Sequence, residues 1–266
     1  MTNLGLIDGD IVAYRCAATC ENESIRIAIY RMEDMLFDIF ASVKAKDYLM
    51  YITGKDNFRN QIDPQYKFNR KDKPRPIHLA ACQEYLITKY KAIVTDGIEA
   101  DDALGIEQCK HLENDDISTV ICSIDKDLLQ IPGNHWNFVK KESTTVSPTQ
   151  GLRHFYKQLL IGDTTDNIFG VRGIGKVKAG YHLDSHDDES DMYNTVKNLY
   201  NEDVRLHMNC NTLWIQQKEG ELWRDREISK TLRGINANKL SETEGQETSA
   251  MDAGHDTHGL PTLDRA

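Results

Sequence analysis

Short apolar runs alternate along this chain with longer amphipathic stretches, and this alternation limits the folds that it can adopt. Apolar runs of strand length occupy residues 4–7, 48–53, 92–95, 119–124 and 136–139. Between them, apolar residues recur at helical spacing over 25–42, 77–91, 100–112 and 148–161. Strands that alternate with helices form mostly parallel sheets whose two faces the helices cover. The sequence therefore predicts an α/β fold with a mostly parallel sheet flanked by helices.

Acidic residues occur where such a sheet binds its ligands. Asp8 and Asp10 follow the first predicted strand, and Asp125 and Asp127 follow the fourth. Two further groups are Glu99, Asp101 and Asp102 in GIEADDALG, and Asp163 and Asp166 in LIGDTTDNI. Open α/β sheets bind ligands beyond the carboxyl ends of their strands. We expect the four groups to converge at that edge.

The four groups together predict a metal site, although each acid alone has an ordinary explanation as a helix or turn cap. Clustered carboxylates repel one another unless cations lie among them. Oxygen ligands without neighbouring histidine or cysteine favour Mg²⁺, with Mn²⁺ as a substitute, over zinc. Two such ions about 4 Å apart can activate water and stabilise the leaving oxygen of a phosphodiester. The chemistry that fits is two-metal-ion hydrolysis.

Two segments have features of DNA binding. In GVRGIGK, residues 170–176, glycines permit a tight turn, and free amides at the next helix start can bind a phosphate. Residues 66–75 combine five basic side chains with Tyr66 and Phe68, whose rings can stack on bases. The alternatives are a plain helix–helix turn and a solvated loop. Their places next to the acidic groups favour DNA binding.

Bulk composition excludes some classes without identifying the function. The net charge of −10 is compatible with a DNA enzyme but does not predict one, because a metal site contributes many of the acids. No apolar run approaches the roughly 20 residues that span a bilayer, and residues 1–10 lack signal-peptide features, so we expect a cytoplasmic protein without a membrane partner. The six cysteines are scattered and are expected to be reduced thiols.

The order of these motifs resembles that of the structure-specific 5′-nuclease family, which includes flap endonucleases and bacteriophage 5′→3′ exonucleases. GIEADDALG and SIDKDLLQ resemble its second and third acidic motifs, and LIGDTTDNIFGVRGIGKVKA resembles its fourth motif and its helix–two-turn–helix. NFRNQIDPQYKFNR resembles the segment before its arch. The resemblance covers roughly residues 4–183. It implies a PIN-like (Rossmann-like) nuclease core and cleavage of DNA from or near a free 5′ end, in phage replication or recombination.

The resemblance also implies roles for individual residues. Lys67 and Arg70 would be catalytic and stabilise developing charge on the scissile phosphate, while Tyr66 would stack near the 5′ nucleotide. The implied metal ligands are Asp8, Glu99, Asp101, Asp102, Asp125, Asp127, Asp163 and Asp166. The implied DNA contacts are Tyr66, Lys67, Arg70, Lys71, Gly170, Arg172, Gly173, Gly175, Lys176 and Lys178. Two Mg²⁺ ions, a candidate K⁺ at the hairpin, and RNA in hybrids as a further substrate complete these expectations.

At one position the chain departs from the family pattern. The family commonly has an aspartate at the end of its second strand, in a pattern like FDG, where this chain has Thr53 in MYITGKDNFR. We expect either a water-mediated role for Thr53 or a substitute acid at Asp56, and a weaker first metal site. Asp10 is an extra acid beside Asp8.

Three other functions remain open from the sequence. Asp8-Gly9-Asp10-Ile11-Val12 fits the DxDx[TV] pattern of haloacid-dehalogenase-like phosphatases, in which Asp8 would be a covalent nucleophile. That alternative leaves the acids of 99–102 and 125–127 and the glycine hairpin unexplained. A PIN-type ribonuclease shares the core but lacks the hairpin. A DNA-junction-binding protein without catalysis is favoured only by the departure at Thr53.

The expected domain organisation follows the motifs. We predict a nuclease core over 1–161 with an arch region at about 57–91, whose residues 57–75 form a mobile connection. Residues 162–208 should hold a helix–two-turn–helix, with two short helices in 162–183, and a further helix over 191–208. Residues 209–235 should pack on the core through Trp214 and Trp223, with a hairpin in 212–223. The last segment, 236–266, is predicted to be a disordered acidic tail.

Overall fold

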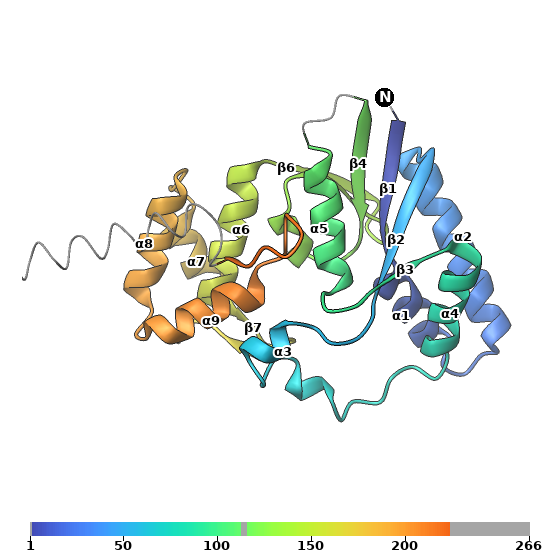
Figure 1. Ribbon diagram of the computed structural model, residues 1–266, viewed down its shortest axis with the longest axis horizontal. Coiled ribbons are helices and arrows are strands. Elements are labelled where there is room, and N and C mark those ends of the chain that lie inside the picture. The colour runs from blue at the N-terminus through green and yellow to red at the C-terminus, as the bar shows by residue number, and fades with distance from the viewer. Residues whose placement is uncertain (1, 113–115, 224–266) are drawn as a thin grey trace, which may run out of the picture. The chain divides into compact units, whose positions relative to one another are not determined.

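The first strand of the chain lies in the middle of the sheet. The computed structural model describes residues 2–112 and 116–223. β1 (Thr2–Asp8) pairs in parallel with β2 (Asp47–Thr53) on one side and with β4 (Ile117–Cys122) on the other. β3 (Ile93–Thr95), β5 (Gly133–Asn137) and an antiparallel β6 (Glu142–Val146) complete the order β3-β2-β1-β4-β5-β6 (Figure 1). The predicted α/β fold with a mostly parallel sheet is confirmed.

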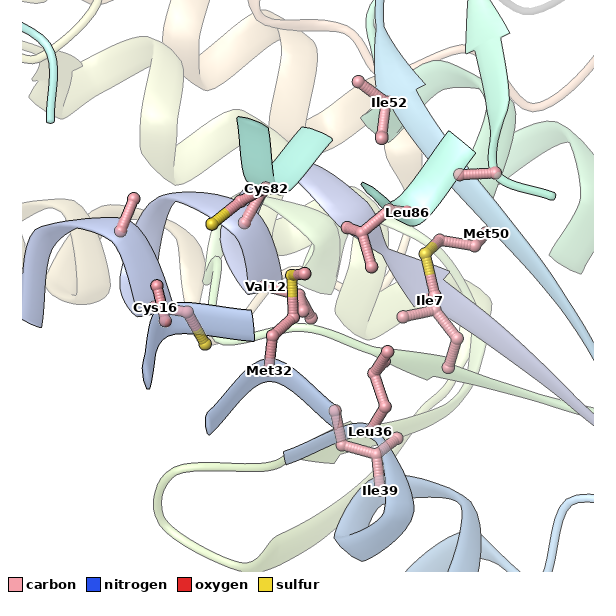
Figure 2. Packing of buried hydrophobic residues seen from close by; sticks show 14 of the residues in the cluster. Ile7, Val12, Cys16, Met32, Leu36, Ile39, Met50, Ile52, Cys82 and Leu86 are labelled. Carbon is pink, nitrogen blue, oxygen red and sulfur yellow. The ribbon is translucent and has the colours of Figure 1, made fainter. Parts of the chain in front are cut away.

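Helices α1 (Gly9–Thr19), α2 (Ile25–Val43) and α4 (Leu79–Tyr90) share one apolar core with the sheet. Ile7 and Met50 contribute from β1 and β2, and Met32, Leu36 and Leu86 contribute from α2 and α4 (Figure 2). All five side chains are at most 1% exposed. Burial of a large apolar side chain contributes about 1.5–3 kcal/mol, so this core stabilises one face of the sheet.

The next residues along the strands supply the opposite core, because successive side chains of a strand point to opposite faces. Leu6, Tyr51 and Ile121 pack there with Leu104 of α5 (Ala100–Lys110) and with Ile215 near the end of the described chain. At Gly105, an added Cβ would lie 2.5 Å from the carbonyl oxygen of Gln216. Only glycine therefore allows α5 to approach the segment after residue 212 this closely.

The remaining helices form a group beside β5 and β6 (Figure 1). α6 (Pro148–Ile161) begins at a capping box in which Ser147 and Gln150 bond each other's backbone amides. It is followed by the two-stranded β7 (Gly162–Asp163) and β8 (Ile168–Phe169), then α7 (Lys176–Leu183), α8 (Glu189–Leu199) and α9 (Asp203–Leu213). Trp214 and Trp223 are at most 1% exposed and contact Phe155 and Tyr193.

Several predicted elements are wrong in detail. α1 and β6 were not predicted, since the acids of LIDGD hid a helix start and ESTTV is exposed on most of its length. Only α7 is helical within 162–183, because Gly162 (φ 76°) ends α6 and residues 162–169 form the β7–β8 hairpin. The single helix over 191–208 is two helices, α8 and α9. Residues 214–223 contain no strand within the described part, so the hairpin in 212–223 is wrong.

The predicted connection over 57–75 has local structure. It contains α3 (Arg59–Ile62) and a 3₁₀ turn, η1 (Phe68–Arg70). The predicted boundaries at 161/162 and 208/209 lie inside one compact unit, Met1–Arg224, and remain predictions as functional divisions. The predicted tail, 236–266, lies outside the described residues. Among the helices that the structure describes, none is long and apolar enough to cross a membrane.

Candidate metal and DNA site

The carboxyl ends of the two central strands bring the first acids together. Asp8 ends β1 and caps α1, where its Oδ1 accepts a hydrogen bond from the amide of Ile11 at 3.0 Å. Its Oδ2 accepts a hydrogen bond from Ser123 Oγ at 2.5 Å, and the same hydroxyl accepts one from the amide of Asp125 at 3.0 Å. Ser123, which the sequence analysis missed, thus joins the acids at the ends of β1 and β4.

Burial and mutual repulsion make this group of acids electrostatically costly. Burial raises the pKa of Asp8 to about 7, with Asp10 and Asp125 adding to the rise against the hydrogen bonds from Ser123 and Ile11. Burial and the neighbouring Asp8 and Asp125 also raise the pKa of Asp101 well above its usual value. The protein therefore places several carboxylates where added positive charge would stabilise their ionised forms.

Glu99 lies on the other side of this group, where Lys67 supplies a cation. The Lys67 ammonium donates to Glu99 Oε1 at 2.5 Å, and Asn57 donates to the same oxygen at 2.8 Å. Burial acts to raise the pKa of Glu99, but Lys67 and Arg59 together hold it below its usual value. Lys67 is also 3.7 Å from Asp166, so one ammonium is shared between two predicted metal ligands.

Asp127 and Asp163, which come from two different predicted groups, lie close together in the structure. Burial raises the pKa of Asp127 to about 7, and Asp125 and Asp163 add to the rise. Its Oδ1 accepts a hydrogen bond of 2.7 Å from the side-chain amide of Gln158, a residue of α6 that the sequence analysis did not single out. Asp163 is partly engaged in its own turn, because its Oδ1 accepts from the amide of Thr165 at 2.6 Å.

Residues 66–75, called here the basic segment, form hydrogen bonds with the loop that carries Asp166. Arg70 donates to Asp166 Oδ1 at 2.5 Å and to the carbonyl of Thr165 at 3.0 Å. The backbone amide of Lys67, whose φ is 53°, donates to the carbonyl of Asp166 at 2.9 Å. The structure therefore brings Lys67 and Arg70 to the acidic groups, and their catalytic role stays a prediction.

Asp102 occupies a different place from the other predicted ligands. It is fully buried, and Arg59 donates to its two oxygens at 2.6 and 2.8 Å. The backbone amides of Glu99 and Gln216 donate to the same two oxygens, each at 3.0 Å. With four hydrogen bonds on its two oxygens, Asp102 is engaged as a structural partner of Arg59, so its assignment as a metal ligand is not supported by this geometry.

Tyr66 also differs from its predicted role. Its side chain is 4% exposed, and its hydroxyl donates to Glu99 at 3.0 Å or to Asp166 at 3.1 Å. A ring buried in this way has no free face for a nucleotide, so the stacking role is wrong for this conformation. Phe68 is 53% exposed with the Lys71 ammonium 4.8 Å from its ring centre, and it is the better candidate for stacking.

Thr53, at the position where the family commonly has an aspartate, forms hydrogen bonds through its hydroxyl and its backbone amide. Its hydroxyl accepts a hydrogen bond of 2.9 Å from the amide of Ala100, at the start of α5. The Thr53 amide donates to Asp10 Oδ2 at 2.9 Å, and Gln83 donates to the other Asp10 oxygen at 3.2 Å. Asp10 therefore braces the end of β2. The exposed Asp56 has left-handed backbone and bears no described contact to these acids.

The glycine-rich turn presents charge and free backbone to solvent. Arg172, Lys176 and Lys178 are exposed, and α7 begins after Gly175 without a side-chain cap. Gly173 has a φ of 82°, which favours glycine, and its carbonyl accepts a hydrogen bond from Lys178 at 2.9 Å. Gly170 lies so close to residues 160–162 that a Cβ would meet their backbone at 2.4 Å. The turn is thus tight, exposed and positively charged.

Within the described ranges, no three acidic, histidine or cysteine side chains are drawn together as a ready coordination shell. Lys67, Arg70 and Gln158 instead contact Glu99, Asp166 and Asp127. The donor set nevertheless fits a hard divalent cation, because it consists of carboxylates, and burial and neighbouring acids raise the pKa values of Asp8, Asp101 and Asp127 among them. A cation would relieve that repulsion.

Comparison with known proteins shows which family this chain is similar to. A family model described as the N-terminal resolvase-like domain of 5′–3′ exonucleases matches residues 3–157. The chain is 28% identical over 235 residues to a 5′–3′ exonuclease of Buchnera aphidicola subsp. Acyrthosiphon pisum (strain APS), which covers 81% of each chain. It is 29% identical over 228 residues to a 5′–3′ exonuclease of Mycoplasma pneumoniae, with 75% of each chain covered.

Solved structures share the fold. A bacteriophage T5 flap endonuclease, in a pseudo-enzyme–product complex with DNA and metal ions, is 16% identical with a TM-score of 0.65, and the match covers 88% of this chain and 98% of that one. A T5 5′-exonuclease with bound zinc is 18% identical with a TM-score of 0.58, covering 79% and 85% of the two chains. At these identities the likeness concerns the architecture alone.

Proposed function

Because the chain belongs to the family of 5′–3′ exonucleases with an N-terminal resolvase-like domain, we propose that it hydrolyses DNA phosphodiesters from or near a free 5′ end. Its activity would be that of a metal-dependent 5′→3′ exonuclease or flap endonuclease. A phosphatase with Asp8 as nucleophile would leave the other acidic groups and the basic segment without a role. The observation that carries the proposal is the meeting of acids from four separate segments with Lys67 and Arg70.

We propose two metal positions within the acidic groups. Asp8, Glu99, Asp101 and Asp125 would hold one ion, and Asp127, Asp163 and Asp166 would hold the other, with Mg²⁺ as the expected metal and Mn²⁺ as a substitute. When bound, such ions activate water and neutralise charge on the phosphate and leaving oxygen. Lys67 and Arg70 would orient the scissile phosphate and stabilise its developing charge, since both already lie against the acids.

DNA would extend from this site to the glycine-rich turn. Arg172, Lys176, Lys178 and the free amides after Gly175 suit contacts to the phosphate backbone, which position a duplex without reading its sequence. Carbonyl oxygens of the turn are the proposed place for K⁺. Lys71 and Phe68 would face the strand near its 5′ end. RNA in a hybrid, a role in phage replication or recombination, and a cytoplasmic location belong to the same proposal.

Cleavage of end-labelled DNA tests this function directly. Duplex and flap substrates labelled at the 5′ or the 3′ end are incubated with Mg²⁺ or EDTA, alongside Asp125→Ala. Short 5′ products that need Mg²⁺ and disappear in the variant are the expected result, because Asp125 lies between Asp8 and Asp127 in the acidic groups. The sizes of the products separate exonuclease from flap cutting.

A matched variant controls for the general loss of an acid. Glu142→Gln removes an exposed carboxylate from β6, far along the sheet from β1, and should leave cleavage unchanged. Intact duplex binding without any cleavage by the unmodified protein would contradict the proposal. That result would instead favour a DNA-junction-binding protein.

A further inference from the structure

The last residues of α9 and the residues that follow them form hydrogen bonds with two buried side-chain groups on different sides of the chain. Between Thr212 and Gln216 the chain leaves the helix, and Trp214 has extended backbone. The carbonyls of Thr212 and Trp214 accept hydrogen bonds from Arg59, at 2.8 and 2.7 Å. The amide of Gln216 donates to Asp102 at 3.0 Å. Residues 212, 214 and 216 thus all face the buried Arg59–Asp102 pair.

The backbone groups of the two intervening residues, Leu213 at the end of α9 and Ile215 after it, bond the side chain of Gln130 instead. The carbonyl of Leu213 accepts a hydrogen bond from the side-chain amide of Gln130 at 2.8 Å. The amide of Ile215 donates to the carbonyl oxygen of the same side chain at 3.3 Å. The backbone therefore fixes the orientation of the Gln130 side-chain amide: its nitrogen faces the carbonyl of Leu213, and its oxygen faces the amide of Ile215.

This orientation passes to Asp127 through a second glutamine. The Gln130 amide nitrogen also donates to Gln158 Oε1 at 2.7 Å, so the oxygen of Gln158 must face Gln130. The nitrogen of Gln158 is then left to donate to Asp127 Oδ1, at 2.7 Å. Gln130 and Gln158 are 2% and 7% exposed, which shields the relay from competing water. Gly151 permits it, because a Cβ there would lie 2.3 Å from the Gln130 carbonyl oxygen.

We propose that residues 212–216, named here the strap, position both proposed metal sites, with Gln158 as a positioning residue for Asp127. On the Arg59 side, Asp102 accepts the amide of Glu99 and closes the capping box at the start of α5, which places Glu99 and Asp101. On the Gln130 side, the relay orients Asp127. The inference rests on the proposed function, because it assumes that these acids hold divalent cations.

Manganese binding to the metal-free protein, without DNA, tests the strap. Free Mn²⁺ is followed by electron paramagnetic resonance during titration of the unmodified chain and of Gln158→Met, which keeps the volume and removes the donor. The titration should resolve two classes of Mn²⁺ site, one for each proposed metal position. The class whose affinity Gln158→Met changes less serves as an internal reference for the other. Loss of a partner that orients a metal ligand typically weakens binding about ten- to hundredfold, and we expect a change of this size.

Gln130→Met distinguishes the relay from an effect that Gln158 alone has on Asp127. This side chain has no described contact with a carboxylate, yet its removal should weaken Mn²⁺ binding in the same direction. The double variant should bind no more weakly than Gln158→Met alone, because the two glutamines act in series. The concentration of Mn²⁺ needed for half-maximal cleavage should shift in parallel, while KM for DNA stays unchanged.

Gln150→Met is the matched control, since it removes a glutamine from the same helix without touching the relay. Its Mn²⁺ binding should equal that of the unmodified chain. Unchanged binding in Gln158→Met, or additive losses in the double variant, would overturn the inference. An unmodified chain that binds no Mn²⁺ and cuts no DNA would instead overturn the proposed function, so the two failures are distinguishable.

Discussion

At the scale of single residues, Lys67 lies between the two proposed metal positions. It contacts Glu99 and lies near Asp166, which belong to different proposed metal positions. Burial acts to lower its pKa, but these two carboxylates raise it above the usual value, so Lys67 is a cation throughout the neutral range. A phosphate that reached these acids would meet this ammonium.

Replacing Lys67 separates catalysis from binding. In Lys67→Ala we expect kcat to fall by roughly 10²–10³, the usual cost of removing a group that stabilises transition-state charge. Duplex binding in EDTA should change little, because the exposed turn at 170–178 retains its cations. Single-turnover cleavage and filter binding measure the two quantities. Lys73→Ala, in the same basic segment, should leave kcat close to the unmodified value, and equal losses of binding and turnover in Lys67→Ala would refute the catalytic role.

The sequence predicted that acids from separate segments converge, because the carboxyl ends of parallel strands meet at one edge of a sheet, and their roles as metal ligands stay predictions. It could not separate Asp102 from Asp101, since adjacent residues of a helix start point in different directions and only the fold supplies Arg59. It also misjudged Tyr66, whose burial depends on α3, η1 and the loop of Asp166 meeting in space. Gln158 has no motif, so nothing in the chain order indicated its contact with Asp127.

At the scale of elements, a buried cation, Arg59, anchors α3 to the rest of the molecule. Arg59 is 2% exposed and bonds Asp102 and the strap. Its pKa lies well above the usual value: burial is the largest single effect and acts to lower it, but the attraction and hydrogen bonds of Asp102, together with Tyr66 and Glu99, outweigh burial. Other elements were predicted where apolar periodicity was strong, as in α2 and α6, and missed where exposed polar residues dominate, as in β6.

Removing this cation should destabilise the whole fold. Arg59→Met leaves Asp102 buried and unpaired, and breaking a buried ion pair on one side costs about 3–5 kcal/mol of unfolding free energy. Urea unfolding in EDTA measures the loss. Arg205→Met is the control: Arg205 lies 4.0 Å from Asp63 and its side chain is 42% exposed, so its loss should cost about 1 kcal/mol or less. Similar losses in the two variants would show that the Arg59–Asp102 pair is not a special anchor.

At the scale of the whole molecule, His154 makes stability depend on pH. Burial, assisted by Lys126 and Lys157, lowers its pKa to about 4, and its Nε2 has no described hydrogen-bond partner. The unfolded chain takes up this proton near the usual histidine pKa of 6.5, whereas the folded chain resists it until about pH 4. Stability should therefore fall as the pH falls from 6.5 to 4, by at most about 3 kcal/mol.

A substitution isolates this contribution from that of the acids. In His154→Gln, the unfolding free energy should depend less steeply on pH between 6.5 and 4 than in the unmodified chain. His78→Gln, at a half-buried histidine that bonds the carbonyl of Glu23, should keep the original dependence. Thermal or urea unfolding at several pH values provides the comparison. Parallel curves for all three proteins would exclude His154 as the source.

The central position of β1 has a consequence for synthesis on the ribosome. β1 is translated more than a hundred residues before β4, with which it pairs, and Asp8 meets Ser123 only once β4 has been made. The strap that contacts Arg59 and Gln130 emerges later still, after α9. A nascent chain therefore exposes this edge of β1 until β4 has been made. The acids that we propose as metal ligands therefore reach their final arrangement only after the strap has left the exit tunnel.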